Sequence, residues 1–232
     1  MTHSDIQEKL RVIADPEIAE HSQRFFKTGK GEYGEGDRFL GIRVPNIRKV
    51  ARQFKQLSHT ETEQLLHSGY HEERLCALII MTNRAKKADP GESEQLYELY
   101  LKNTEYINNW DLVDTSAEHV VGRYLANNNS QVLYELAHSD SLWERRIAIM
   151  STFHFIKNDE FEDTLAIAEI LLHDEHDLIH KASGWMLREI GKRDMDTEEQ
   201  FLDNHIQQMP RTMLRYAIEK FPEERRQYYL SY

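Results

Sequence analysis

Proline and glycine are scarce in this sequence, with 5 and 10 residues among 232. A β-sandwich or barrel needs many tight turns and therefore more of both residues. The single cysteine, Cys76, allows no intramolecular disulfide and no cysteine-rich metal cluster, which indicates a reducing compartment. No apolar run approaches the roughly 20 residues that span a bilayer, and the N-terminal residues lack a signal-peptide core. We therefore expect a soluble, cytoplasmic protein without a large sheet.

Basic residues are also few compared with acidic residues. Lys and Arg number 29 against 40 Asp and Glu, so the formal net charge is −11. Taken alone, this balance argues against a nucleic-acid partner, because phosphate contacts need clustered cations. The basic residues are nevertheless grouped, in segments 43–55, 84–87, 181–193 and 211–215, whereas acidic residues gather at 61–63, 159–163 and 194–199. A basic face within an acidic protein is one interpretation, and a solvated surface with no ligand is the other.

Helical periodicity is present almost everywhere, and no segment reads as a strand. Ile6, Leu10 and Ile13 recur at helical spacing after Ser4, which is a candidate N-cap. Pro45 and Pro90 stand at first-turn positions, where the missing N–H costs nothing. The pattern predicts an all-α protein, with later helices near 110–126, 130–138, 141–157, 160–173, 177–193, 196–206 and 210–220.

Five alanines sit in comparable segments of the chain: Ala77, Ala117, Ala148, Ala182 and Ala217. Their spacing is close to 35 residues, with two helices in each period, which is typical of stacked helix-pair repeats. We therefore predict a curved α-solenoid of antiparallel helix pairs forming one domain over residues 1–232. An ordinary helical bundle gives a degenerate pattern of the same kind and stays open as the alternative.

The expected inner helices carry an unusual set of side chains. Trp110 and Asp114 are four residues apart and therefore share one helix face. Arg145 and Arg146 lie on a later inner helix, and Trp185 lies on the one after. If the repeats stack in register, these side chains meet in one groove. The alternative is that the tryptophans pack between repeats and Asp114 pairs with Arg146.

Four ordered segments carry a resemblance to a known family. They are Phe39-Leu-Gly-Ile-Arg-Val-Pro45-Asn-Ile-Arg-Lys49, Trp110-Asp-Leu-Val-Asp114, Trp143-Glu-Arg-Arg-Ile-Ala-Ile149 and Lys181-Ala-Ser-Gly-Trp-Met-Leu-Arg-Glu189. In this order and at these separations they resemble the AlkD-like DNA alkylation repair proteins, which are built of HEAT-like repeats. The resemblance covers nearly the whole chain. Asn109 departs from it, because the characterised pattern has a second tryptophan there.

The resemblance implies a DNA glycosylase that excises cationic alkylated purines, N3-alkyladenine and N7-alkylguanine, without a metal, a cofactor or a base-flipping pocket. It assigns the catalytic cleft to Asp114, Trp110, Trp185 and Arg146. The partner would be double-stranded DNA with alkylated bases, bound by a monomer in a bacterial-type cytoplasm and associated with the nucleoid. The residues expected to bind DNA are Phe25, Arg43, Arg48, Lys49, Arg52, Arg145, Lys181, Arg188, Lys192 and Arg215.

Other interpretations compete with this one. A non-catalytic solenoid that binds DNA structures or a protein partner would explain the repeats, but it has no need of Asp114 between two groove tryptophans. His176 and His180 have the i, i+4 spacing of metal ligands on a helix. They fall where a repeat's turn and the start of its helix belong, so we expect no metal. The glycine-rich segment 29–36 lacks the ending of a phosphate-binding loop, and Cys76 reads as a core residue.

Overall fold

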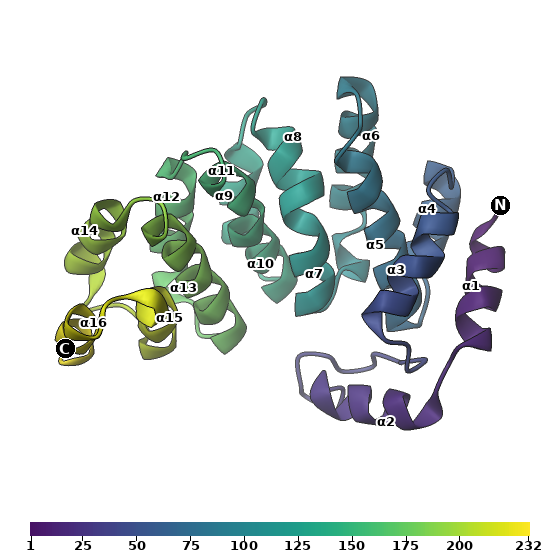
Figure 1. The fold of residues 1–232 in the computed structure, drawn as a ribbon, viewed down its shortest axis with the longest axis horizontal. Coiled ribbons are helices and arrows are strands. Elements are labelled where there is room, and N and C mark those ends of the chain that lie inside the picture. The colour runs from purple at the N-terminus through teal and green to yellow at the C-terminus, as the bar shows by residue number, and fades with distance from the viewer. The chain divides into compact units, whose positions relative to one another are not determined.

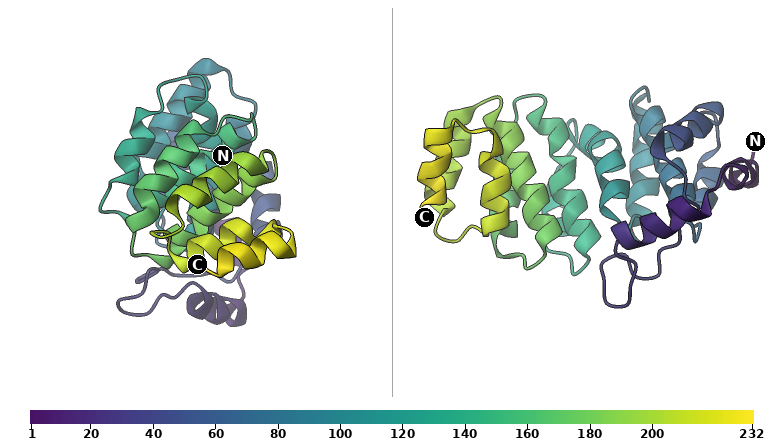
Figure 2. Two further views of the ribbon diagram at one scale, coloured as in Figure 1. Left: turned by 90° about the vertical axis from the view of Figure 1, so that its left-hand side faces the viewer. Right: turned by 60° about the horizontal axis from the view of Figure 1, so that its bottom comes forward.

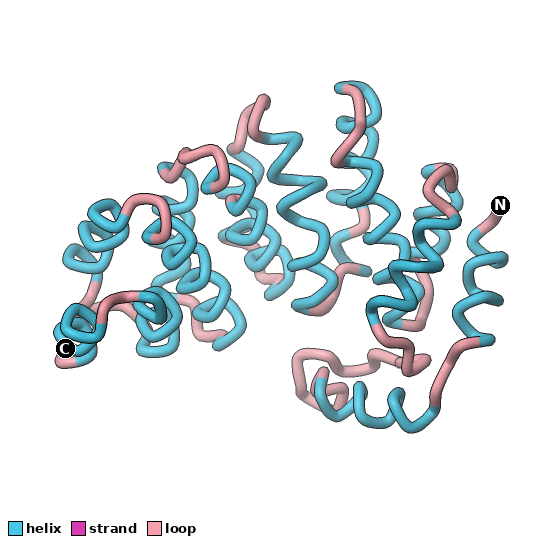
Figure 3. The backbone as a smooth tube through the Cα atoms, in the orientation of Figure 1, coloured by secondary structure: helices cyan, strands magenta, loops and turns pink.

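The computed structural model describes residues 1–232, and it consists of helices and loops without a strand (Figure 3). The prediction of an all-α protein is confirmed. No helix is both long enough and apolar enough to cross a membrane. The chain divides into two compact units, Met1–Val120 and Val121–Tyr232. The solenoid arrangement and the single domain over residues 1–232 stay predictions.

The first unit contains seven helices, labelled in Figure 1: α1 (His3–Val12), α2 (Pro16–Phe25), α3 (Val44–Gln53), α4 (His59–Leu66), α5 (His71–Ala85), α6 (Pro90–Lys102) and α7 (Trp110–Ala117). Pro45 and Pro90 occupy first-turn positions, as expected. Thr2, not Ser4, caps α1. Its hydroxyl accepts a hydrogen bond from the Asp5 backbone amide, and the Asp5 carboxylate accepts one from the Thr2 amide, which is a capping box. Helix α4 was not among the predicted elements.

Helix α5 is the centre of the first unit, since 13 of its 15 residues are buried. It packs against α3, α4 and α7. Its first turn is polar as well as buried, and the Glu72 carboxylate accepts the amides of Leu40, Gly41 and Ile42. Gly41 has a φ of +80°, and a Cβ there would lie 1.9 Å from the carbonyl oxygen of Asp15, so only glycine fits. The start of α5 thus fixes the segment that joins α2 to α3.

The second unit contains the remaining helices: α8 (Arg123–Leu125), α9 (Gln131–Ala137), α10 (Leu142–Ser151), α11 (Phe153–Ile156), α12 (Glu162–Ile170), α13 (Asp177–Gly191), α14 (Met195–His205), α15 (Arg211–Ala217) and α16 (Glu223–Leu230). Helix α13 is central, with α10, α14 and α15 against it. At Gly184 an added Cβ would lie 2.3 Å from the Met213 carbonyl oxygen, so the close approach of α15 depends on this glycine.

A carboxyl group is buried between α13 and α14. Glu198 is 1 % exposed and packs against Gly191, and its Oε1 has no hydrogen-bond partner. Burial raises its pKa to about 9, and the opposing charge of Arg188 does not offset this. The pKa of Glu198 is therefore higher in the folded protein than in the unfolded chain. The contribution of Glu198 to stability is complete below about pH 4.5 and is lost progressively as the pH rises toward 9.

Replacing Glu198 with glutamine is therefore expected to stabilise the protein at neutral pH. The amide keeps the shape of the side chain and has no proton to lose, so we expect the free energy of unfolding to rise by about 1–3 kcal/mol at pH 7.5. Urea unfolding at pH 7.5 and 4.5 tests this, because the gain should vanish at the lower pH. The exposed Glu160→Gln is the matched control and should give no gain at either pH. Equal stability of Glu198→Gln and the wild type at pH 7.5 would contradict the assignment.

Candidate functional site

A cavity of about 440 Å³ lies within the first unit between α3, α5 and α7. Trp110 and Asp114, one turn apart on α7, both line it, as the helical spacing predicted. Arg48 and Arg52 of α3 line the same cavity, and Lys86 at the end of α5 completes its basic side. Asp111 lines it as well, so the cavity joins an aromatic ring, two carboxylates and three cations. Four of the predicted site residues are brought together here.

Trp110 is the first residue of α7 and is held by two aromatic residues at the end of α2. Its ring stacks on Phe26, with centroids 5.4 Å apart and 20° between the planes, and meets the edge of Phe25 at 6.1 Å. Figure 2 shows α2 and the loop after it on one side of the first unit. Phe25, a predicted DNA contact, is 58 % exposed. It therefore offers a free ring surface beside Trp110.

A cluster of buried charged residues lies beneath Trp110. The His71 ring stands between two carboxylates, with Nδ1 2.8 Å from Asp37 Oδ2 and Nε2 2.8 Å from Asp111 Oδ2. Arg74 donates to Asp37 Oδ1 at 2.5 Å. Asn109 is fully buried; its amide donates to Asp37 at 3.3 Å and its oxygen accepts the Trp110 amide at 2.9 Å. The start of α7 is therefore tied to the loop that ends at Asp37.

The pKa values of this cluster follow from its geometry. Burial alone would lower the pKa of His71, but the charge of Asp111 and the hydrogen bonds to both carboxylates outweigh it and raise the pKa to about 9. Burial likewise opposes ionisation of Asp37, yet the hydrogen bond from His71 and the charge of Arg74 lower its pKa to about 2. At neutral pH both groups are charged.

A second cavity of about 670 Å³ shares Arg52 and Lys86 with the first and extends the basic surface. Lys55 and Lys87 also line it. Arg84 lines it too, but this side chain is occupied, since it pairs with Glu92 and donates to the Leu57 carbonyl oxygen at 2.6 Å. Most of the basic side chains that the sequence grouped at 43–55 and 84–87 therefore form neighbouring parts of one surface.

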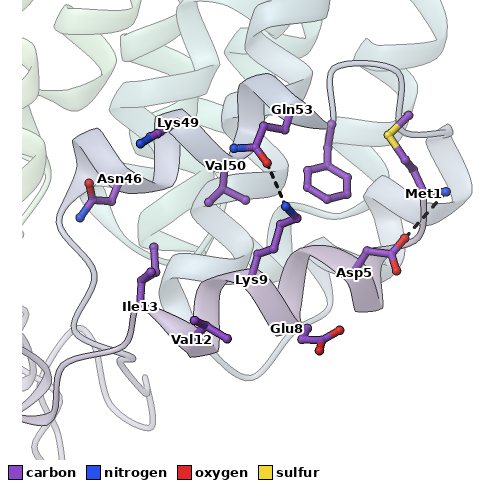
Figure 4. A pocket seen from close by; sticks show the side chains of 11 residues that line it. Met1, Asp5, Glu8, Lys9, Val12, Ile13, Asn46, Lys49, Val50 and Gln53 are labelled. Atoms are coloured by element: carbon purple, nitrogen blue, oxygen red, sulfur yellow. Dashed lines mark hydrogen bonds and ion pairs between the residues drawn. The ribbon is translucent and has the colours of Figure 1, made fainter.

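Two other predicted DNA contacts from this part of the chain, Arg43 and Lys49, line neither of these two cavities. Arg43 precedes α3 and is exposed. Lys49 lines a separate cavity of about 850 Å³ between α1 and α3, together with Val50 and Lys9 (Figure 4). The reason is helical geometry, because residue 49 is rotated by about 100° from residue 48 around the α3 axis. Lys49 is thus separated from the cavity that contains Trp110 and Asp114.

The two remaining predicted catalytic residues belong to the second unit. Arg146 on α10 is 4 % exposed, and its Nη1 donates to the Leu178 carbonyl oxygen at the start of α13 at 2.5 Å. Trp185 on α13 is half-buried, donates from Nε1 to Glu189 at 3.0 Å, and lies 6.0 Å from the Phe153 ring.

Most of the cations predicted to bind DNA in the second unit are engaged with carboxylates. Arg145 pairs with Asp174 at 2.6 Å and also donates to two backbone oxygens, so it holds a turn. The other pairs are Lys181 with Asp177, Arg188 with Glu219 and Lys192 with Glu189. Arg215 on α15 is exposed. The Arg145–Asp174 pair is largely buried, whereas the Lys181–Asp177 pair is exposed. An exposed pair stabilises a fold by only about 0–1 kcal/mol, so of these cations Lys181 is the one that phosphate can recruit at least cost.

The histidine pair near α13 has local partners. His176 Nδ1 accepts the Leu178 amide at the start of the helix, and His180 Nε2 lies 2.5 Å from the Asp174 carbonyl oxygen. No group of three or more His, Cys, Asp or Glu side chains is placed to hold a metal ion. Cys76 is buried, and burial raises its pKa to about 12, as suits a core thiol.

Three comparisons with known proteins bear on the chain. The family model described as DNA alkylation repair enzyme matches residues 6–221. A solved structure described as a predicted DNA alkylation repair enzyme from Enterococcus faecalis superposes with a TM-score of 0.70 at 18% sequence identity, covering 90% of this chain and 97% of that one. At this identity the likeness establishes the fold. No curated protein matches the chain.

Proposed function

Because the chain belongs to the DNA alkylation repair enzyme family, as its motifs predicted, we propose that it is a DNA glycosylase that excises cationic alkylated purines. Family membership supports a role in alkylation repair. The observation that carries the finer proposal is the cavity of the first unit, in which Asp114 lies one turn from Trp110 and beside three cations. A pure scaffold has no use for this carboxylate on the wall of a basic cavity that an indole also lines.

The chemistry needs little from the protein. An N3- or N7-alkylated purine is positively charged, so it leaves as a neutral base when the bonding electrons of the glycosidic bond pass to its ring. No general acid is required. Positive charge then develops on the sugar, and water adds to C1′ and loses a proton. The enzyme's task is to stabilise that charge and to position the water.

Asp114 is the residue suited to this task. Its carboxylate, half-buried on the wall of the cavity, would stabilise the oxocarbenium-like sugar and orient the attacking water. Trp110 would pack on the deoxyribose and offer its π-face to the developing charge, an effect worth about 0.5–2 kcal/mol. Arg48, Arg52 and Lys86 would bind the phosphates on either side of the lesion.

The resemblance assigns two further catalytic residues, and both assignments stay proposals. Trp185 would offer a second aromatic face to the sugar. Arg146 would hold a flanking phosphate through a charge-assisted hydrogen bond. Since Arg146 already donates to the Leu178 carbonyl oxygen, only its remaining N–H groups are open to that role.

Release of damaged bases tests the proposal. The protein is incubated with DNA that has been treated with a methylating agent, and the released bases are identified by mass spectrometry. We expect N3-methyladenine and N7-methylguanine to appear faster than in protein-free samples, with no release from untreated DNA. DNA binding without any release above the spontaneous rate would overturn the glycosylase proposal and favour a non-catalytic DNA-binding protein. The burial of Arg146 agrees with that alternative.

A further inference from the structure

The Trp110 ring and the first turn of α7 depend on a residue that no motif of the sequence points to. We propose that His71 is a positioning residue that fixes Trp110 and the first turn of α7 by bridging Asp37 and Asp111. The bridge joins three segments, the loop that ends at Asp37, the start of α5 and the start of α7. Its effect on excision rests on the proposed function, whereas its effect on the position of Trp110 does not.

The bridge requires a doubly protonated ring. A carboxylate only accepts hydrogen bonds, and a neutral imidazole donates from one nitrogen only. With both ring nitrogens 2.8 Å from a carboxylate oxygen, both donate, and His71 is an imidazolium. The charged groups around it are Asp37 from the loop, Asp111 from α7 and Arg74 from α5. Two positive and two negative charges therefore balance in a buried site, which agrees with the raised pKa of His71.

Two routes connect this bridge to Trp110. The first is covalent, since Asp111 is the next residue of the chain, and its hydrogen bond to His71 orients the first turn of α7. The second runs through aromatic rings. The His71 ring packs on Phe39 at 4.6 Å and on Phe26 at 5.0 Å, and Phe26 in turn stacks on Trp110. His71 thus supports the indole of Trp110 in two ways, through Asp111 in the first turn of α7 and through the ring of Phe26.

Loss of one proton breaks the arrangement. Neutral His71 keeps a single donor, so either Asp37 or Asp111 loses its hydrogen bond. Asp37 retains Arg74 and Asn109, whereas the other oxygen of Asp111, Oδ1, already lacks a partner. A carboxylate oxygen that is buried without a donor is strongly unfavourable. The Asp111 side chain is 15 % exposed and lines the cavity, so it can turn toward solvent there, whereas Asp37 is 2 % exposed. As the pH rises through about 9, we therefore expect Asp111 to lose its hydrogen bond to His71. The first turn of α7, which carries Asp111, then loses its attachment to α5.

The position of Trp110 can be followed without any activity. Protein labelled with 5-fluorotryptophan gives three ¹⁹F NMR signals, for Trp110, Trp143 and Trp185, and Trp110→Phe identifies the first. Between pH 7 and 10 the Trp110 signal should titrate with a midpoint near 9 in the wild type and should not titrate in His71→Gln. The matched control is His67→Gln, an exposed histidine of the same unit, which should keep the wild-type titration. A Trp110 signal that does not titrate in folded wild-type protein would overturn the proposal.

A second variant covers the case in which His71→Gln does not fold. Asp111→Asn keeps an oxygen that accepts from His71 but removes one of the two negative charges that hold its proton. We expect the midpoint of the Trp110 titration to fall by at least about one pH unit, since an opposite charge at hydrogen-bond distance shifts a pKa by roughly 1–3. An unchanged midpoint would show that some other group titrates, and the bridge would be wrong.

DNA affinity and excision rate of His71→Gln together distinguish a positioning role of His71 from a purely structural one. His71 is buried and lines neither basic cavity, so His71→Gln should bind DNA as tightly as the wild type. Its single-turnover excision rate should fall about tenfold or more, because small displacements of catalytic groups are costly. Equal loss of affinity and rate would contradict a positioning role. If the wild type releases no base at all, the proposed function fails, while the ¹⁹F titration still decides the role of His71.

Discussion

Asp114→Asn is expected to lower the single-turnover rate of excision by about 10²–10³-fold, which is the usual cost of removing one preorganised electrostatic group. Asparagine keeps the shape of the side chain on the cavity wall and removes its charge. The carboxylate matters most when positive charge moves onto the sugar, so the loss falls on the transition state and not on binding. DNA affinity should be unchanged or slightly higher, because a negative charge facing phosphates has been removed.

The measurement is release of N7- or N3-methylpurine with enzyme in excess over DNA, set against Kd from the same preparation. Spontaneous depurination of these cationic lesions sets a floor under the rate of the variant. Asp140→Asn, which removes an exposed carboxylate from the second unit, is the control and should excise at the wild-type rate. Wild-type excision by Asp114→Asn would show that this carboxylate is structural, and the electrostatic mechanism would be wrong.

Local signals in the sequence predicted most helices of this protein correctly. Apolar spacing places α13 at Asp177–Gly191 against an expected 177–193, and the first-turn prolines mark α3 and α6. Trp110 and Asp114 line one cavity because they are one helical turn apart, and that relation depends on α7 alone. Predictions of this kind succeed because each rests on residues within one or two turns of each other.

The parts that the sequence did not reveal depend on distant residues. His71 lies 34 residues from Asp37 and 40 from Asp111, and no local pattern links them. No motif marks the glycine-rich segment 29–36 as structural, yet it leads into Asp37, which is buried and anchors the starts of α5 and α7. Phe26, which supports Trp110, is indistinguishable in sequence from its exposed neighbour Phe25. Only the stacking of Phe26 on Trp110, far away in the sequence, separates their roles.

The ion-pair partners of the predicted DNA-binding cations were likewise not evident from the sequence. A count of cations near Trp185 suggests a basic surface, but Lys181, Arg188 and Lys192 each have a carboxylate within their own unit. The cations of the first unit differ, since Arg48, Arg52, Lys55, Lys86 and Lys87 are exposed along two adjoining cavities. For a protein with net charge −11, we therefore expect the first unit to supply most of the phosphate contacts of the proposed DNA complex.

The affinity of the protein for DNA is expected to fall about 10³-fold between 50 and 200 mM salt. Each phosphate neutralised by a cation releases counterions, and log K falls with log salt at a slope of about −0.9 per contact. Six exposed cations, the five above and Arg43, give a slope near −5 on this relation. Fluorescence anisotropy with a labelled duplex at several salt concentrations measures the slope directly. A flat salt dependence would point to a partner other than DNA.

A triple variant tests whether the cavity that contains Trp110 and Asp114 accounts for part of the slope of log K against log salt. Changing Arg48, Arg52 and Lys86 together to glutamine should make the slope shallower by about 2.7, three contacts at about 0.9 each. The matched control changes Arg24, Lys102 and Lys220 to glutamine, three exposed cations of which none lines either basic cavity. Both variants lower the net charge by three, so an effect of overall charge alone would move both slopes equally. A shallower slope in the first variant only means that phosphates lie beside Asp114, where the proposed chemistry needs them.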